Sequence, residues 1–414
     1  MAQVETKAGN SRAREAKSVT VAKSAWPSHE IDEVEAATEV LRSGKVNALV
    51  HGLQNRAFEK EFASYVGAPY AIAVSNGTVA LELALRALGI GPGDEVIVPA
   101  RSFFATTSAV VAVGAQPVFA DVEPDTQNID PDSVERMIGE ATRAIICVHL
   151  AGLPCDMSRL CEIASSHSLR LIEDCAQAHG ATWNGQEVGS FGDAAAFSFC
   201  TDKIMSTGGE GGMVLVKEED AWGTAWAYKD HGKDPLRLRE PSRGGAGEFR
   251  YLHDTFGSNF RMTEMQAAIG RRQLTKLDGW VSRRRENAEA FLAEACKSPA
   301  VIPMRLPEAA AHSYYKVYVR LDLDLLGDAI DRSDIVAGLM LEGIMCGSGS
   351  CPDMSREGAL KDRSVKRDGN LSNAHRLARE TLMFQVDHTF STEDTAKFGR
   401  HLAEVVNMHM AARK

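Results

Sequence analysis

Seven short apolar segments, spaced along residues 70–216, constrain the fold of this chain more than any other feature. Helical patterns separate several of them, at residues 79–88 and 131–138. Continuous apolar segments that alternate with helices are typical of strands buried on both faces of a mostly parallel sheet. The sequence therefore predicts an α/β fold around a mostly parallel, seven-stranded sheet. The expected strands are residues 70–74, 95–98, 117–120, 144–149, 170–173, 194–199 and 212–216.

The pattern changes after residue 259. Residues 262–279 have the apolar spacing of a long amphipathic helix, and residues 281–296 continue helically. A mixture of shorter elements follows, which predicts a smaller α+β domain. Its expected elements are a strand at residues 313–321 and helices at residues 332–342, 372–382 and 392–408.

We expect three regions in a chain of 414 residues, which is long enough for two domains. The polar residues 1–25 predict a flexible N-terminal arm. Residues 26–280, which contain the seven expected strands, are expected to form a large domain, and residues 281–414 a small C-terminal domain. Within the large domain, residues 232–248 are rich in Gly, Arg, Lys and Pro and predict a mobile loop.

Charge and cysteine content narrow the classes of function. The net charge of -10 offers no basic field for nucleic acid, and no polybasic segment points to a membrane surface. No apolar segment is long enough to span a bilayer. The eight cysteines lack CxxC spacing, so we expect no metal site, and reduced thiols of a cytoplasmic protein.

The strongest single candidate for chemistry is Lys203. It follows the expected strand at residues 194–199 and precedes a glycine cluster at residues 208–212. Desolvation at the end of a buried strand makes a lysine amine nucleophilic, as a Schiff-base lysine must be. Taken alone, a surface lysine on a glycine-rich loop is the better interpretation, so the assignment depends on its partners.

Three further strand ends carry such partners. Residues 74–78 end a strand in Gly77 and Thr78 and open a helix, whose free N–H groups favour a phosphate. Asp174 follows another strand and can pair with a protonated ring nitrogen, or it can cap a helix. Phe103 follows a third strand and can stack on a planar ring, or it can belong to the core.

These features together fit one ligand. A phosphate site, a stacking aromatic, a carboxylate for a pyridinium and an amine for an aldehyde all fall at strand ends of one predicted sheet. The ligand with these four groups is pyridoxal 5'-phosphate (PLP).

The chain also resembles a known family at five segments. They are residues 75–81, 91–99, 173–180, 197–203 and 259–268. On these motifs the chain resembles the DegT/DnrJ/StrS family of PLP-dependent sugar aminotransferases, over nearly everything after the N-terminal arm. The resemblance implies the type I, aspartate aminotransferase-like fold and a homodimer with active sites at the interface.

The resemblance also implies a role for individual residues. Lys203 would bind the cofactor covalently and Asp174 would pair with its ring nitrogen. The other cofactor-binding residues implied are Gln177 at the ring hydroxyl, Phe103 on the ring face, Gly77, Thr78 and Ser198 at the phosphate, and Asn259 at the phosphate of the neighbouring subunit. The motifs differ from the common pattern at Cys200, Ile204 and residues 346–352, none of which is a cofactor residue.

The sequence therefore predicts an aminotransferase that moves an amino group from glutamate to a keto-sugar. The sugar is expected to be nucleotide-linked and the pathway to be amino-sugar or surface-polysaccharide biosynthesis. Two alternatives within the family are a transaminase of cyclitol ketones and a PLP enzyme that does not transaminate, such as an aminohydroxybenzoate synthase. Relatives that dehydrate deoxysugars replace the lysine with His, so Lys203 argues against them.

Two alternatives of other classes have less support in the sequence. A PLP-binding regulator would be expected to carry a helix-turn-helix, and none precedes Trp26. A Rossmann dehydrogenase would be expected to carry G-x-G-x-x-G after its first strand, and that motif is missing there.

Overall fold

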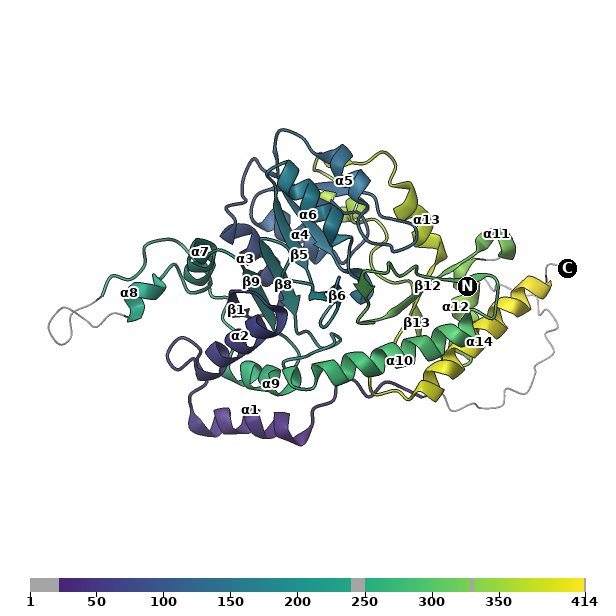
Figure 1. Cartoon of the computed structure of the whole chain (residues 1–414), viewed down its shortest axis with the longest axis horizontal. Helices are drawn as coiled ribbons and strands as arrows, with labels where there is room; N and C mark the ends of the chain where they lie inside the picture. The colour runs from purple at the N-terminus through teal and green to yellow at the C-terminus, as the bar shows by residue number, and fades with distance from the viewer. Residues whose placement is uncertain (1–21, 240–249, 328–330, 413–414) are drawn as a thin grey trace, which may run out of the picture.

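The computed structural model describes residues 22–239, 250–327 and 331–412 (Figure 1). Residues 1–21 of the expected flexible arm lie outside the described residues. Residues 240–248 of the expected mobile loop also lie outside them. Of the arm, residues 22–25 are described, and the Ser24 hydroxyl there donates a hydrogen bond of 2.7 Å to Asp387.

The seven predicted strands all form, and they lie in one central sheet. In spatial order the sheet is β1-β9-β8-β5-β4-β2-β3-β14. β9 pairs antiparallel with β1 and β8, and the other pairings are parallel. The strands are β1 (Tyr70–Val74), β2 (Glu95–Pro99), β3 (Gln116–Ala120), β4 (Thr142–Val148), β5 (Arg170–Asp174), β8 (Ala194–Ser198) and β9 (Gly212–Val216).

The sheet has one strand more than the seven predicted. β14 (Lys366–Arg367) extends the sheet beside β3, with Lys366 opposite Val118. Its two residues are both exposed and charged, so they lack the apolar pattern by which the sequence marks a strand.

Helices cover both faces of the central sheet, as continuous apolar strands require. One face is packed by α3 (Gly77–Ala87), α4 (Ala105–Ala112), α7 (Glu219–Lys229) and α13 (Ser372–Glu380). The opposite face is packed by α2 (Leu53–Val66), α5 (Pro131–Met137), α6 (Met157–Ser166) and α9 (Glu264–Leu274). α1 (Ile31–Ser43) packs outside α9 (Figure 1).

The C-terminal part has its own sheet and core. Its four strands are ordered β10 (Val301–Pro303), β12 (Val317–Leu321), β15 (Thr381–Phe384) and β13 (Cys346–Gly347). α10 (Leu277–Ala295), α12 (Arg332–Leu341) and α14 (Thr392–Ala412) contribute to the same core. In Figure 1, α10 runs from α9 to α14. The remaining short elements are β6 (Thr182–Trp183), β7 (Gln186–Glu187), β11 (Ala310–Ala311), α8 (Pro235–Arg239) and α11 (Leu323–Leu326).

Four predicted elements in this part have wrong bounds, and one of them, the helix expected at residues 392–408, continues to Ala412. The helix expected at residues 262–279 is divided in two. α9 starts at a capping box of Thr263 and Gln266 and ends at Leu274, and α10 begins at Leu277. The strand expected at residues 313–321 begins only at Val317. The helix expected at residues 372–382 ends at Glu380, because the next residues pair with β12.

α10 runs through residue 280, where the sequence divides the two domains, and that division stays a prediction. Across the described parts of the chain, none of the helices combines the length and the apolar character that crossing a membrane requires.

Candidate active site

A cavity of about 700 Å³ lies at the ends of β1, β2, β5 and β8. In open α/β sheets this edge of the strands is where ligands bind. The C-terminal part of the chain closes the cavity with Tyr315, Tyr318 and residues 349–350. Seven of the eight residues that the sequence proposes for the cofactor line this cavity: Gly77, Thr78, Phe103, Asp174, Gln177, Ser198 and Lys203.

Lys203 is held by side chains from distant parts of the chain. Its amine donates to the Tyr315 hydroxyl at 3.5 Å and lies 3.8 Å from a carboxylate oxygen of Asp202. The Tyr315 hydroxyl itself donates to Asp202. The indole N–H of Trp26 donates to the Lys203 carbonyl oxygen at 2.8 Å. These contacts fix both the main chain and the amine of Lys203. The Lys203 side chain is only 16% exposed.

Asp174 ends β5 and is buried. Its carboxylate accepts hydrogen bonds from the Thr106 hydroxyl at 2.9 Å and from the Ala176 N–H at 3.2 Å. Burial raises the pKa of Asp174, against the opposing effects of these two donors and of the Lys203 charge. A positively charged ring nitrogen beside this carboxylate would favour its ionised form.

A close contact of main chains forms the candidate phosphate site. Asn76 caps α3 through a hydrogen bond of 3.0 Å from the Val79 N–H. A Cβ at Gly77 would lie 2.5 Å from the Ser198 Cβ, so only glycine lets the start of α3 approach the end of β8 this closely. The free N–H groups of α3, at Gly77 and Thr78, and the Ser198 hydroxyl therefore border the same cavity and suit an anion.

Gln177 and Phe103 line other walls of the cavity. The Gln177 side-chain oxygen accepts a hydrogen bond of 2.7 Å from the Ala151 N–H, which fixes its amide. Phe103 is 67% exposed although it lies beside the cavity, so it is not the core aromatic that the sequence allows as an alternative. An exposed aromatic face at a cavity wall suits a planar ring.

Asn259 is the one predicted residue that the structure does not bring to this cavity. It is exposed and forms an isolated antiparallel bridge with Asp230. Next to it, the Phe260 carbonyl oxygen accepts a hydrogen bond of 2.9 Å from the Ser75 N–H, so this segment lies beside the end of β1.

Sequence reasoning missed three residues of the site. Thr106 carries a weak signal, because it lies three positions after Phe103 at the same strand end. Asp202 directly precedes Lys203, but an exposed turn carboxylate looks the same in a sequence. Tyr315 is separated from Lys203 by 112 positions and has no local signal.

Glu173, next to Asp174, belongs to the other side of β5. Its carboxylate accepts hydrogen bonds from the main-chain N–H groups of residues 189, 191 and 192 at 2.7–2.8 Å and from the His149 ring at 3.1 Å. His149 accepts the Cys155 N–H on its other ring nitrogen. These atoms and the Cys175 thiol lie within the range of one metal ion, but N–H donors already occupy the carboxylate. The set is therefore structural.

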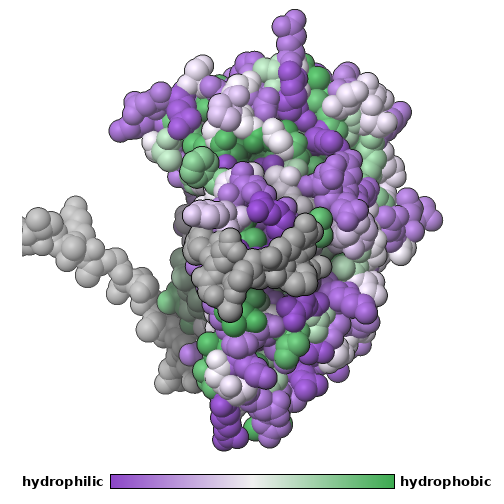
Figure 2. Space-filling model, turned by 90° about the vertical axis from the view of Figure 1, so that its left-hand side faces the viewer, coloured by the Kyte–Doolittle hydropathy of each residue, from purple (hydrophilic) through white to green (hydrophobic). Residues whose placement is uncertain are grey.

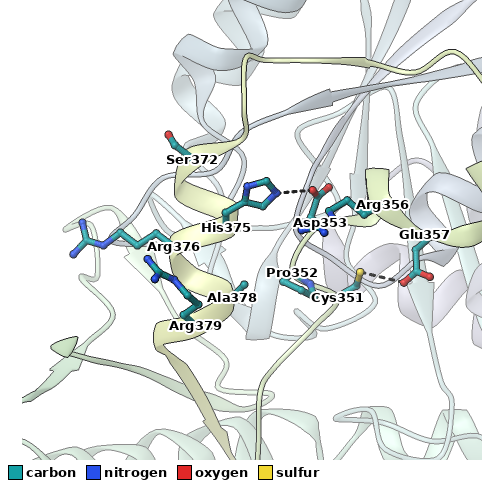
Figure 3. Close-up of a pocket in the computed structure, with 10 residues that line it drawn as sticks. All are labelled: Cys351, Pro352, Asp353, Arg356, Glu357, Ser372, His375, Arg376, Ala378 and Arg379. Carbon is teal, nitrogen blue, oxygen red and sulfur yellow. Dashed lines mark hydrogen bonds and ion pairs between the residues drawn. The ribbon is translucent and has the colours of Figure 1, made fainter. Parts of the chain in front are cut away.

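A second hollow, of about 630 Å³, lies between α13 and residues 351–357 (Figure 3). In it His375 points toward Asp353 at 2.8 Å, and the Cys351 thiol donates to Glu357 at 3.3 Å. None of the eight predicted residues lines this hollow. We therefore place the candidate active site in the larger cavity.

Comparison with known proteins identifies the family of the chain. A model of the DegT/DnrJ/EryC1/StrS aminotransferase family matches residues 27–402. The chain belongs to this family. The match confirms the predicted family, the predicted α/β fold of PLP-dependent aminotransferases and the predicted enzyme class.

Two curated relatives illustrate the activities within the family. GDP-perosamine synthase of Escherichia coli O157:H7 is 41% identical over 259 residues, which are 63% of this chain and 67% of that protein. L-Glutamine:2-deoxy-scyllo-inosose aminotransferase of Streptomyces fradiae is 38% identical over 77% of this chain and 75% of its own length.

Two solved structures show the likeness in three dimensions. An aminotransferase from Psychrobacter cryohalolentis is 42% identical with a TM-score of 0.88, over 94% of this chain and 99% of its own. GDP-4-keto-6-deoxy-D-mannose-3-dehydratase of E. coli, solved with bound hydrated PLP, is 28% identical with a TM-score of 0.81, over 93% of this chain and 98% of its own.

Proposed function

We propose that this family member transfers an amino group from glutamate to a nucleotide-linked keto-sugar, with PLP as its cofactor. The observation that carries the proposal is that the Lys203 amine and the Asp174 carboxylate line one cavity at the carboxyl edge of the sheet. A sugar aminotransferase of amino-sugar biosynthesis agrees with the relatives. The cofactor agrees with the family and with PLP in a solved relative.

The residues that line the cavity offer a binding partner for each part of PLP. The N–H groups at the start of α3, at Gly77 and Thr78, together with the Ser198 hydroxyl would hold the phosphate. Phe103 would cover one face of the ring, and Gln177 would contact the ring hydroxyl. Because Gly77 has no Cβ to collide with Ser198, the start of α3 and Ser198 lie close enough to contact one phosphate.

When bound, PLP supplies an aldehyde that takes up the amino group and a ring that accepts the electrons of the bond broken at the donor's Cα. Asp174 keeps a proton on the ring nitrogen, because the ionised carboxylate stabilises a positive charge there. The Lys203 amine takes the proton from the donor's Cα. It would return this proton to the cofactor carbon that is bonded to the transferred nitrogen. Tyr315 and Asp202 hold Lys203 within reach.

The choice of substrates is tested by mass spectrometry of the products. Purified holoenzyme is incubated with α-¹⁵N-glutamate or α-¹⁵N-glutamine and with either a nucleotide-linked 4-keto-sugar or a cyclitol ketone. We expect label from glutamate in the amino-sugar. Label only in an aminocyclitol would instead favour the activity of the Streptomyces relative, and release of ammonia without amination would favour a non-transaminating enzyme.

The assembly that we propose is a homodimer in which Asn259 of one subunit completes the phosphate site of its partner. Two features support it. Asn259 is exposed and lies outside the cavity of its own chain. Apolar side chains are exposed on α1 and on the projecting segment around α8. They include Ile31, Leu236 and Phe256, and the last of these is 99% exposed. Figure 2 views the molecule from the end where that segment projects and shows hydrophobic patches among the polar ones.

Subunit mixing tests this assembly. Lys203→Ala and Asn259→Ala subunits, each inactive alone, are co-expressed with different tags and purified as mixed dimers. One site then carries both lesions and the other carries neither, so activity should return to about half of the wild-type value per dimer. Mixed dimers without activity would exclude a shared site.

We also propose a cytoplasmic location, which all eight free cysteines support.

A further inference from the structure

Arg101 is an arginine buried without an acidic partner. It is 1% exposed and follows β2. Its Nε donates to the Gln127 side-chain oxygen at 3.1 Å, and its Nη2 donates to the Ser348 carbonyl oxygen at 3.4 Å. Its Nη1 is buried and has no hydrogen-bond partner among the described residues. Both partners of this cation are therefore neutral.

The other arginine with a fully buried side chain shows the difference. Arg284 donates to two carbonyl oxygens, and the charges of Asp387 and Asp202 favour its ionised form against the cost of burial. Burial lowers the pKa of both arginines, but none of the carboxylates in the described residues offsets this effect at Arg101. A buried charge without a counter-charge is costly, so proteins rarely retain one without a use.

Arg101 lies directly behind one wall of the active-site cavity. Gly349 and Tyr318 form that wall. A Cβ at Gly349 would lie 3.0 Å from Arg101 Nη2 and 3.1 Å from the Tyr318 ring. Gly349 has a positive φ of 83°, which favours glycine, so no side chain separates the guanidinium from this wall. The neighbouring Ser102 hydroxyl also lines the cavity and is buried without a hydrogen-bond partner.

We propose that Arg101 supplies the counter-charge for a carboxylate of the amino donor at the wall formed by Gly349, Ser102 and Tyr318. The proposal rests on the aminotransferase function proposed above. In any amino-acid donor the α-carboxylate is bonded to the carbon whose proton Lys203 removes, so it must enter this cavity together with that carbon. The phosphate of the cofactor already has the start of α3, so the donor carboxylate is the anion that must lie next to the reacting carbon.

The carboxylate needs no direct contact with the guanidinium for this role. Two opposite charges attract over several ångströms where little water intervenes. Arg101 is thus a residue that determines donor specificity through its charge. We therefore expect that donors with a carboxylate bind and that the corresponding amines without a carboxylate do not.

The first test uses the protein without cofactor. 2-Oxoglutarate, added as a probe, should raise the Tm of the wild type and leave that of Arg101→Met unchanged. Inorganic phosphate should raise the Tm of both equally, because its site is the start of α3. If phosphate rather than 2-oxoglutarate loses its effect in Arg101→Met, the anion at this wall is a phosphate and the proposal is wrong.

A control variant separates charge from structure. Arg320→Met also removes a buried guanidinium, but that of Arg320 pairs with Glu380 at 3.1 Å. Arg320→Met should therefore lower the Tm, whereas Arg101→Met should maintain or raise it without added anion. If Arg101→Met destabilises the protein as much as Arg320→Met, or fails to fold, Arg101 is structural and the proposal is overturned.

The second test uses the holoenzyme. Arg101→Met should raise the KM for the amino donor by about 100-fold with little change in the KM for the keto acceptor, and Arg101→Lys should restore part of the loss. Equal donor KM values in wild type and Arg101→Met would refute the role of Arg101 alone. If the wild type neither binds PLP nor transfers an amino group, the proposed function fails instead.

Discussion

Two neighbouring carboxylates on β5 show how differently one strand can use its two sides. Glu173 is enclosed by the protein's own donors, from residues 189–192 and His149. Asp174 faces the cavity with two neutral donors, from Thr106 and Ala176. Both carboxylates are buried, so burial alone does not distinguish a structural carboxylate from a catalytic one.

The difference lies in how completely the protein satisfies each group. A carboxylate with charge-assisted N–H bonds on every side stabilises the fold. A buried carboxylate that is only partly satisfied costs stability unless a ligand supplies the rest. Changes on the cavity side should therefore lower activity while the fold stays intact, and changes on the core side should do the reverse.

The largest effect is expected on the cavity side at Lys203. Lys203→Ala should lower the rate of amino transfer by a factor on the order of 10⁴ or more, about 5 kcal/mol, because the proton at Cα loses its acceptor. The rate is measured in single turnovers with glutamate, with the Tm as a control for folding. In the wild type, borohydride reduction followed by peptide mass spectrometry should locate PLP on Lys203, and a label on another lysine would reject the assignment.

At Asp174, the Asn variant keeps the shape and removes the charge. We expect Asp174→Asn to lower the rate by about 10³, or about 4 kcal/mol, because the ring nitrogen is no longer kept protonated. The same single-turnover measurement applies. Near-normal turnover would show that Asp174 only organises the turn at Ala176.

On the core side, Glu173→Gln should lower the free energy of unfolding by about 3 kcal/mol, because the neutral amide weakens several charge-assisted hydrogen bonds. Denaturant unfolding measures this loss. The rate of amino transfer should remain within about three-fold of the wild type once the variant is folded. A loss of rate like that of Asp174→Asn would remove the distinction between the two sides of β5.

Thr106→Val removes one hydroxyl donor of Asp174 and keeps the shape of the side chain. The rate should fall about ten-fold, close to 1.4 kcal/mol, because one hydrogen bond to a charged group is lost. The matched control is Thr107→Val, whose hydroxyl contacts the Met354 sulfur at 3.5 Å instead. Equal effects of the two variants on the rate would mean that the Thr106 hydroxyl acts only through packing.

The smallest effect concerns stability and pH. Burial raises the pKa of Asp174, so its ionised form opposes folding above that pKa, and this opposition disappears as the pH falls through it. Without cofactor, Asp174→Asn should therefore have a slightly higher Tm than the wild type at pH 8. The difference should shrink toward about pH 4, near the pKa of an unfolded aspartate. A difference independent of pH would contradict this account.

Much of the architecture could be predicted because it depends on local patterns of apolar residues in the sequence. The seven apolar segments all form strands of one sheet, since a run of four to six mostly apolar residues is a sufficient signal for a strand buried on both faces. The elements that were misjudged depend on neighbours. β14 is charged and exposed, and the start of β15 at Thr381 pairs with Arg320, far away in the sequence.

The sequence by itself determined which residues stand at strand ends, and therefore which of them could meet at one edge of a parallel sheet. Lys203, Asp174 and Ser198 are of this kind, because chain direction and strand length fix their position. Only the tertiary structure decided that Tyr315 holds Lys203 and that Arg101 lies behind Gly349 without a carboxylate. The physical reason is that these contacts join segments more than a hundred residues apart, whose distance depends on how the two parts of the chain pack together.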